Sequence, residues 1–265
     1  MNGIGNSTTV KSAQRVLSTL EILAQNPIGL NFTDLLGELE IPKSSLHQLL
    51  NTLVETRMIQ FESESKKYIL GVRIWEIAME YTNRLSISQV AQPFIEHLRD
   101  TYDETVQMAI LDGTDVVYVA KMKSKRPVQL ASQVGSRLPA YVTGIGKALL
   151  ACVSSPQIEK MYPNTNLPSF TDNTITTREE LIRVLQATKK RGYARDLGEY
   201  SPEIRCVAVP ILSFGNVPVA AISFSVLEEQ ASDEKEAILT RGLLECAESL
   251  SLRLGATDPF AWQNI

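Results

Sequence analysis

Short hydrogen-bonding side chains gather near the start of one predicted helix, in the stretch IPKSSLHQLLNTLVETRMI (41–59). The apolar residues of this stretch repeat at helical spacing and form one stripe: Leu46, Leu49, Leu50, Leu53 and Val54. The polar residues lie on the opposite side: Ser44, Ser45, Gln48, Asn51 and Glu55, with His47 at the border. Hydroxyl and amide groups placed in this way suit hydrogen bonds to base edges in a DNA groove. The same pattern is also typical of an ordinary solvated helix surface.

Basic residues flank this polar surface where DNA phosphates would lie, at Lys43, Lys66 and Lys67. Acidic residues oppose them, because the first 72 residues hold six Lys and Arg against seven Asp and Glu, and the whole chain carries a net charge of −4. Lysines near strand turns also serve solubility. A nucleic-acid-binding hypothesis therefore depends on where the positive charges lie, since their number does not support it.

The segments around this helix predict a unit that can present it. A helix is predicted over 12–25, a second over 33–39, and the polar helix begins near Lys43 after the break at EIP. Two extended runs follow, RMIQFE and KKYIL, joined by the polar turn SESK. Three helices followed by a two-stranded ribbon are the order of a winged helix-turn-helix.

The rest of the chain predicts a second, mixed domain. After Gly71 a helical stretch carries an apolar stripe that a partner subunit can cover. From Thr105 the period changes to two, and TVQMAILDGTDVVYVAKM predicts a hairpin. The next segments predict a short strand at PVQLAS, a helix at TGIGKALLAC and two helices over 157–162 and 178–191. They are followed by a second hairpin and a last helix over 232–254. Strands and helices in this order predict an α+β fold.

The second hairpin, EIRCVAVPILSFGNVPVAAISFSV, predicts the floor of a cavity. A turn centred on Gly215 and Asn216 pairs Cys206 with Ser225 and Ala208 with Ser223, and strand alternation places these four side chains on one face. The other face carries the bulkier residues Ile222, Phe224 and Val226. A small, mildly polar face leaves room for a ligand. The alternative is that helices pack closely over the small residues.

The stretch TGIGKALL predicts a helix entry with Thr143 as its N-cap. It lacks the spacing of a phosphate-binding glycine loop, and Ala148 supplies no hydroxyl for magnesium after Lys147. Gly144 and Gly146 let a ligand approach the backbone, whose unpaired N–H groups favour an anion such as a carboxylate. The alternative is that the glycines only permit close packing.

Enzymatic, metal-binding and membrane functions find little support in the sequence. The chain has 265 residues, 44% of them hydrophobic, without the roughly 18 consecutive apolar residues of a membrane helix. Cys152, Cys206 and Cys246 lie far apart, and the two histidines, His47 and His97, form no metal-binding or catalytic motif. Cys206 as a nucleophile lacks an evident base. We expect a cytoplasmic protein that is not an enzyme and needs no cofactor or metal.

The chain resembles the IclR family of bacterial transcriptional regulators over nearly its whole length. Three stretches carry the resemblance: IPKSSLHQLLNTLVE, GSRLPAYVTGIGKALLA and RGYARDLGEYSPEIRCVAVPILSFGNVPVAAISFSV. Residues 1–9 are small and polar, which predicts a disordered N-terminus. The resemblance implies an α+β protein with a winged helix-turn-helix DNA-binding domain (10–72), a linker helix (73–89) and a GAF-like effector-binding domain with an antiparallel sheet flanked by helices (90–257). A C-terminal tail (258–265) follows. The resemblance also implies homodimers or dimers of dimers on double-stranded operator DNA.

By this resemblance the effector-contacting positions are Leu130, Leu138, Gly144, Ile145, Asp196, Cys206, Ala208, Ser223 and Ser225. The DNA-contacting residues are predicted to be Lys43, Ser44, Ser45, His47, Gln48, Asn51, Lys66 and Lys67. The family commonly has arginine where this chain has Gln48 and threonine where it has Ser45. Gln48 can still read adenine or contact a phosphate, but it adds no charge to the DNA contact.

The hypothesis is therefore a ligand-responsive regulator that represses a catabolic operon and binds a small organic acid in its C-terminal domain. Repression is preferred over activation because it is the commoner mode in the family that the chain resembles. Two alternatives stay open, an enzyme that processes a small acid and a winged helix used for protein contact. The compound, the operator and the direction of the effector's action are not specified by the sequence.

Overall fold

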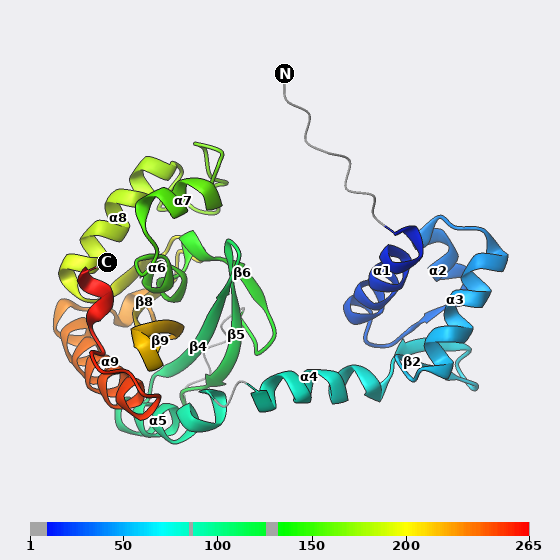
Figure 1. The fold of residues 1–265 in the computed structure, drawn as a ribbon, viewed down its shortest axis with the longest axis horizontal. Helices are drawn as coiled ribbons and strands as arrows, with labels where there is room; N and C mark the ends of the chain where they lie inside the picture. Colours follow the sequence, from blue (N-terminus) through cyan, green and yellow to red (C-terminus); the bar gives the residue numbers. More distant parts are fainter. Residues whose placement is uncertain (1–9, 85–86, 126–131, 265) are drawn as a thin grey trace. The chain divides into compact units, whose positions relative to one another are not determined.

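The computed structural model describes residues 10–84, 87–125 and 132–264 (Figure 1). The chain divides into two compact units, Met1–Ser86 and Ile87–Ile265, and each is described by itself. The predicted disordered segment 1–9, Leu130 and most of the predicted strand PVQLAS lie outside the described residues. Within those residues no helix is both long and apolar enough to cross a membrane.

The first unit contains three helices and a small sheet: α1 (Lys11–Gln25), β1 (Leu30–Asn31), α2 (Phe32–Leu39), α3 (Lys43–Glu55), β2 (Ile59–Glu62) and β3 (Lys67–Leu70). The apolar stripes predicted for the helices meet in one core that includes Leu23, Leu35, Leu46 and Leu50. The sheet is antiparallel with order β1-β3-β2, so the predicted two-stranded ribbon has a third strand. A strand of two residues is too short to show an alternating pattern in the sequence.

Local signals position α2 and α3. Asn31 caps α2 in a reciprocal capping box with Asp34, whose carboxylate accepts from the Asn31 backbone N–H at 3.1 Å. Glu40 then takes a left-handed conformation with φ of 49°, and Pro42 precedes α3. Gly71 follows β3, and the close approach of the chain requires a glycine there because a Cβ atom would lie 2.1 Å from the Arg57 carbonyl oxygen. The last helix of the unit, α4 (Val72–Arg84), exposes Trp75 (64%) and Ile77 (45%).

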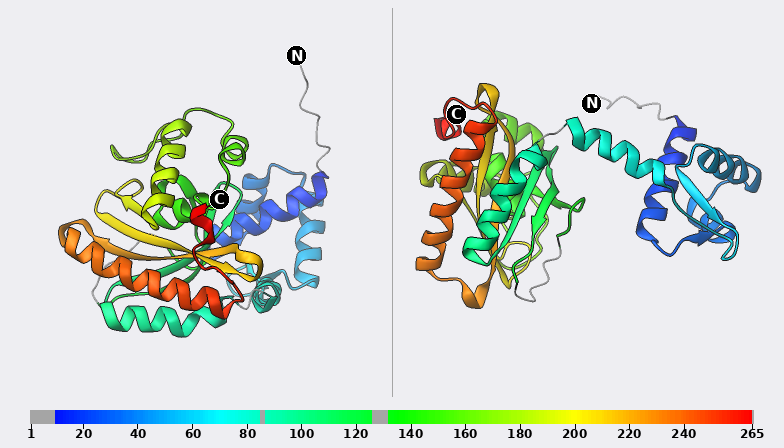
Figure 2. Two further views of the ribbon diagram at one scale, coloured as in Figure 1. Left: turned by 60° about the vertical axis from the view of Figure 1, so that its left-hand side comes forward. Right: turned by 90° about the horizontal axis from the view of Figure 1, so that it is seen from below.

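The second unit is built on a six-stranded antiparallel sheet with order β6-β5-β4-β9-β8-β7. In chain order its strands are β4 (Thr105–Asp112), β5 (Asp115–Met122), β6 (Arg137–Pro139), β7 (Ala194–Leu197), β8 (Ile204–Ser213) and β9 (Val217–Leu227). Helices α5 (Ile87–Tyr102) and α9 (Asp233–Arg253) lie side by side on one face (Figure 2). On that face Tyr102 of α5 contacts Phe224 of β9, with ring centroids 5.3 Å apart.

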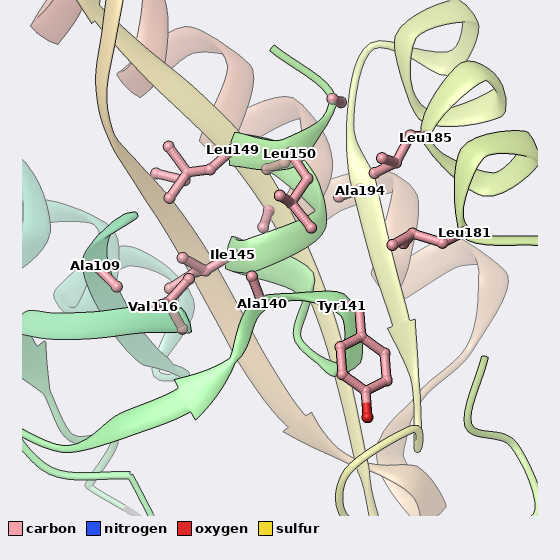
Figure 3. Packing of buried hydrophobic residues seen from close by; sticks show 14 of the residues in the cluster. Ala109, Val116, Ala140, Tyr141, Ile145, Leu149, Leu150, Leu181, Leu185 and Ala194 are labelled. Atoms are coloured by element: carbon pink, nitrogen blue, oxygen red, sulfur yellow. The ribbon is translucent and has the colours of Figure 1, made fainter. Parts of the chain in front are cut away.

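The other face of the sheet carries α6 (Gly144–Leu150), with α7 (Ser155–Met161) and α8 (Arg178–Arg191) beyond it. Figure 3 shows Leu150 of α6 beside Ala194 of β7, with Leu181 and Leu185 of α8 beyond that strand in the same core. Thr143 caps α6, as predicted, by accepting a hydrogen bond from the Gly146 N–H at 2.9 Å. The core of this unit therefore surrounds the short helix whose sequence suggested a ligand site.

The β8–β9 hairpin has the predicted register but a different turn. Cys206 pairs with Ser225 and Ala208 with Ser223. The loop consists of the three residues 214–216, in which Gly215 (φ 74°) and Asn216 (φ 57°) have positive φ angles. The prediction of a loop with an even number of residues, centred on Gly215 and Asn216, was therefore wrong by one residue. The register shifts between Ile211 and Leu212, and this irregularity restores the predicted pairing farther along the strands.

Candidate functional site

One cavity of about 350 Å³ in the second unit collects most of the residues predicted to bind a ligand. Seven of the nine predicted positions line it: Leu138, Gly144, Ile145, Asp196, Cys206, Ser223 and Ser225. Ala208 lies just below, since its Cβ atom is 3.6 Å from the place where a Cβ on Gly144 would lie. Leu130 is outside the described residues. The cavity lies between the small-residue face of the sheet and the start of α6, where the hairpin pattern predicted it.

The two glycines of α6 have different roles. A Cβ atom on Gly146 would lie 2.0 Å from the Ala140 carbonyl oxygen, so this glycine is required by close packing and the packing explanation is right for it. Gly144 lines the cavity, and a Cβ atom there would lie 3.2 Å from the Cys206 Cβ atom. A methyl group at position 144 would therefore narrow the cavity next to Asp196 and Cys206.

Asp196 is a buried carboxylate whose one oxygen is held by the backbone. The Asp196 residue is 6% exposed, and its Oδ1 accepts from the N–H groups of Gly198 (3.1 Å) and Glu199 (3.0 Å). Burial raises the pKa of Asp196, while nearby Lys147 opposes the rise. Arg195 lies on the other side of β7 and pairs with Glu236 of α9. The neighbouring arginine thus does not neutralise Asp196 directly, although the two residues are adjacent in the sequence.

A buried ion pair next to Asp196 was missed by the sequence analysis. Lys147 of α6 donates a hydrogen bond from Nζ to Glu199 Oε2, and their side chains are only 1% and 8% exposed. Burial raises the pKa of Glu199 to about 7, an effect that Asp196 adds to and Lys147 opposes. The ammonium group of Lys147 therefore pairs with Glu199 and acts on the second buried carboxylate, Asp196, through its charge alone. Because the partners are 52 positions apart, no local pattern connects them.

A chain of hydrogen bonds across the cavity floor was also missed. Cys206 Sγ lies 3.3 Å from Ser225 Oγ, Ser225 Oγ donates to Gln107 Oε1 at 3.1 Å, and Gln107 Nε2 donates to Ser132 Oγ. Burial raises the pKa of the Cys206 thiol, which agrees with an inert cysteine and not with a nucleophile. Gln107 falls between the buried apolar residues Val106 and Met108. A polar side chain between two buried apolar residues of a strand was the only sequence signal that Gln107 faces a polar site.

The residues predicted to contact DNA lie on the surface of the first unit. Lys43, Ser44, His47, Gln48 and Asn51 of α3 are exposed, while Ser45 is half-buried. The Asn51 amide and the His47 ring are hydrogen-bonded, with Nδ2 and Nδ1 3.2 Å apart. The apolar stripe of α3 faces inward, since Leu46 and Leu50 are buried.

The β2–β3 hairpin carries the other predicted contacts. Lys66 is exposed in the turn with a positive φ of 56°, and Lys67 at the start of β3 is half-buried and pairs in register with Glu62. The helix and the hairpin of this unit thus present polar and basic side chains to solvent, as a winged helix-turn-helix does.

Comparison with known proteins covers both units. Residues 12–63 match the model of the IclR helix-turn-helix domain, and residues 79–252 match that of the bacterial transcriptional regulator IclR C-terminal domain. The HTH-type transcriptional regulator XynR of Escherichia coli is 31% identical over 246 residues, which are 93% of this chain and 98% of XynR. The HTH-type transcriptional repressor AllR of Salmonella typhimurium is 28% identical over 264 residues, covering 98% and 96% of the two chains.

A solved structure has the same fold. It is an IclR homolog from Microbacterium hydrocarbonoxydans in complex with 4-hydroxybenzoate, 26% identical in sequence, with a TM-score of 0.81 over 92% of this chain and 98% of that one. The mixed helix and sheet architecture described above is therefore shared with a protein of known structure.

Proposed function

The chain belongs to the IclR family of bacterial transcriptional regulators, and we propose that it is a repressor of a catabolic operon that responds to a small organic acid. The observation that carries the proposal is the presence, in one chain, of an exposed polar helix in a helix-turn-helix and of a buried polar cavity in a separate unit. A family of regulators and not of enzymes also agrees with the burial of the Cys206 thiol, which raises its pKa and makes it a poor nucleophile.

The cavity is proposed as the effector site. Its volume suits a small metabolite, its walls combine apolar side chains with a few convergent polar groups, and this combination is typical of ligand pockets. A relative of the same fold was crystallised with 4-hydroxybenzoate, a small carboxylic acid. We propose that the effector contacts include Asp196, Cys206, Ser223 and Ser225 on the floor and Gly144 above them.

The DNA-contacting surface is proposed to be the exposed side of α3 together with the β2–β3 hairpin. Gln48 and Asn51 would read base edges, and Lys43, Lys66 and Lys67 would contact phosphates. Ser44, Ser45 and His47 complete the surface. A protein with this role works on operator DNA in the cytoplasm.

We also propose that the chain acts as a homodimer or a dimer of dimers. Trp75 and Ile77 of α4 are exposed apolar side chains, and large exposed apolar groups are typical of interaction surfaces. Two DNA-binding units on one duplex would read two half-sites, as helix-turn-helix dimers do.

An electrophoretic mobility shift with the DNA upstream of the protein's own gene tests the proposal. We expect a retarded band at low ionic strength that weakens steadily as salt is added, because phosphate contacts release counterions. A library of small carboxylic acids, first screened for a rise in melting temperature, should contain a compound that releases the band. The Gln48→Ala, Asn51→Ala double variant is the control and should lose the band while keeping the thermal response.

A protein that ignores every fragment of its neighbouring DNA at low ionic strength would overturn the regulator proposal. A band that no stabilising acid changes would overturn the effector proposal alone.

A further inference from the structure

The floor of the effector cavity consists of two rows of paired residues that cross the sheet. The first row contains Asp196, Cys206, Ser225 and Thr105. The second row contains Ala194, Ala208, Ser223, Gln107 and Lys121. Directly paired residues of antiparallel strands point to the same face of a sheet, so both rows lie on the cavity face. The first row therefore begins at the Asp196 carboxylate on β7, and the second row ends at the Gln107 amide on β4 and the Lys121 ammonium group on β5.

These two ends are well separated. Strands β7 and β4 are three strand spacings apart in the sheet order, which corresponds to about 14 Å between their backbones. The side chains of Asp196 and Gln107 extend from these strands into the cavity. A ligand lying along the floor therefore meets different chemistry at its two ends.

The Gln107 end offers hydrogen-bond donors. Gln107 is 4% exposed, and its amide donates to Ser132 Oγ, so the Ser132 hydroxyl proton is directed elsewhere. Ser223, which pairs with Gln107 and lines the cavity, is 2% exposed, and its hydroxyl forms no hydrogen bond to a described residue. Two hydroxyl donors thus flank the Gln107 amide, an arrangement that suits an anion.

A positive charge reinforces this end. Lys121 is paired with Gln107 in register and donates from Nζ to the backbone carbonyl oxygen of Ser132. Its ammonium group is therefore next to a residue that lines the cavity. A ligand carboxylate close to Ser132 would be attracted by this charge.

The Asp196 end offers acceptors. Both carboxylates that line the cavity belong to the β7–β8 side, Asp196 on β7 and Glu203 immediately before β8. Asp196 Oδ1 accepts two backbone N–H groups, and Oδ2 accepts from no described residue. Lys147 is nearby but is paired with Glu199. A ligand carboxylate would be repelled here, while a ligand hydroxyl can donate to Oδ2.

The start of α6 is the place where the sequence predicted an anion. This helix has only seven residues, and one of its first N–H groups, that of Gly146, already donates to Thr143 Oγ1. Its capacity to hold a carboxylate is correspondingly reduced.

We propose that Gln107, Ser132 and Lys121 form the carboxylate-binding end of the pocket, and that the effector is a monocarboxylic acid with a hydroxyl or other hydrogen-bond donor at its far end. This inference rests on the proposed function and deepens it by specifying the class of ligand and its orientation. Gln107 is the specificity-determining residue, because its amide orients the hydroxyl groups of both Ser225 and Ser132.

A series of four compounds with the same six-carbon chain tests the inference by calorimetry: ω-hydroxyhexanoate, hexanoate, adipate and hexanediol. We expect ω-hydroxyhexanoate to bind about tenfold or more tightly than each of the others, because each of these lacks or mismatches one charged hydrogen bond. Hexanoate lacks the donor for Asp196, adipate places a second carboxylate there, and hexanediol lacks the anion.

Variants of the glutamine then assign the ends. Gln107→Glu is nearly isosteric and should weaken the binding of ω-hydroxyhexanoate by more than about tenfold. The affinity for hexanediol should be unchanged, because only the acid carries a carboxylate that the new carboxylate repels. If the glutamate variant folds poorly, Gln107→Met replaces it in the test. This variant adds no charge and should also lower the affinity for the acid. Gln186→Glu on the exposed side of α8 makes the same charge change far from the pocket and should alter neither compound.

Equal affinity for the four compounds, no binding of any of them, or an unchanged acid affinity in Gln107→Glu would each overturn the inference. None of these results depends on DNA binding, which the mobility shift measures without any ligand. A protein that retards its DNA but binds none of the four compounds thus refutes the ligand class and leaves the regulator proposal standing.

Discussion

Two glutamines of this chain illustrate how differently its two units use the same chemical group. Gln48 of α3 is exposed, and its amide makes no hydrogen bond to another described side chain. Gln107 of β4 is 4% exposed, donates to Ser132 and accepts from Ser225. Water already satisfies the first amide, so it is available to a partner at little cost. The second must be satisfied by neighbours, because an unpaired buried polar group is costly.

The comparison extends to charges. On the first unit, Lys43 and Lys66 are exposed, and changes there should affect binding and hardly stability. In the second unit, Lys147, Glu199 and Asp196 are all buried, so each depends on the others for folding as well as for any role in ligand binding. Sites on the two units should therefore respond to mutation in separable ways, and the following predictions examine that difference.

The largest effect is expected for Lys147→Met. Removing the ammonium leaves the carboxylates of Glu199 and Asp196 buried without their cation, which should lower the free energy of unfolding by about 3–5 kcal/mol. Urea denaturation measures this value. The matched control is Lys43→Met on α3, whose side chain is exposed and whose loss should change stability little. Equal stability of the two variants would remove the contrast between the units.

Ser223→Ile should abolish the effector response while preserving operator binding. The larger side chain fills the cavity floor beside Gln107, so the ligand is excluded although the helix-turn-helix is unchanged. Mobility shifts with and without the stabilising acid measure both properties. Ser249→Ile on the exposed side of α9 serves as the control for added bulk and should still respond. An unchanged response in Ser223→Ile would count against the cavity as the effector site.

The stability of the second unit should depend on pH through Glu199. Burial raises the pKa of this carboxyl from 4.5 to about 7, so the folded protein holds a proton that the unfolded chain would release. The resulting stabilisation is complete below pH 4.5 and is lost as the pH rises through about 7. The free energy of unfolding of the wild type relative to Glu199→Gln should therefore decrease over this range. A constant difference between the two proteins would contradict the shift.

Gln48→Ala or Asn51→Ala should change which base pairs are preferred. Each lost base contact is expected to reduce discrimination at one operator position by about 1–3 kcal/mol, without a change in stability. Binding to a set of operators mutated one position at a time measures this effect. Uniform weakening across the set would instead assign these side chains to the phosphate backbone.

The smallest effect is expected for Lys67→Ala. The loss of one phosphate contact should weaken binding to all sequences alike and reduce the slope of log affinity against log salt by about one. Glu64→Ala, in the same hairpin, is a useful counterpart because removal of a negative charge should strengthen binding. A Lys67→Ala protein with an unchanged salt slope would place the β2–β3 hairpin away from the DNA.

Much of the fold could be predicted because the signals are local. The stripe of Leu46, Leu50 and Leu53 predicted the buried side of α3, and all three residues are buried. The pairing of Cys206 with Ser225 followed from strand alternation and is confirmed, although the turn itself was wrong by one residue. The two-residue strand β1 and the strand β6 (Arg137–Pro139) were missed because such short segments have no period.

The candidate site was only half predictable. Seven of its lining residues followed from the resemblance and the hairpin pattern, but Gln107, Ser132 and the Lys147–Glu199 pair did not. Lys147 was considered only as a residue of a phosphate-binding loop that the spacing excluded. A lysine within an apolar helix gives no indication of which acidic residue, dozens of positions away, will neutralise it.

The sequence by itself determined the two-unit plan, the outward polar side of α3 and the small-residue floor of the cavity, because hydrophobic periodicity and capping act between near neighbours. The tertiary structure alone decided that β4 lies beside β9, which brings Gln107 to Ser223 and Ser225 and gives the cavity two unlike ends. It also decided that Lys147 meets Glu199. Such contacts depend on long-range strand order and on the requirement that every buried polar group find a partner. Neither can be predicted from the pattern of neighbouring residues in the sequence.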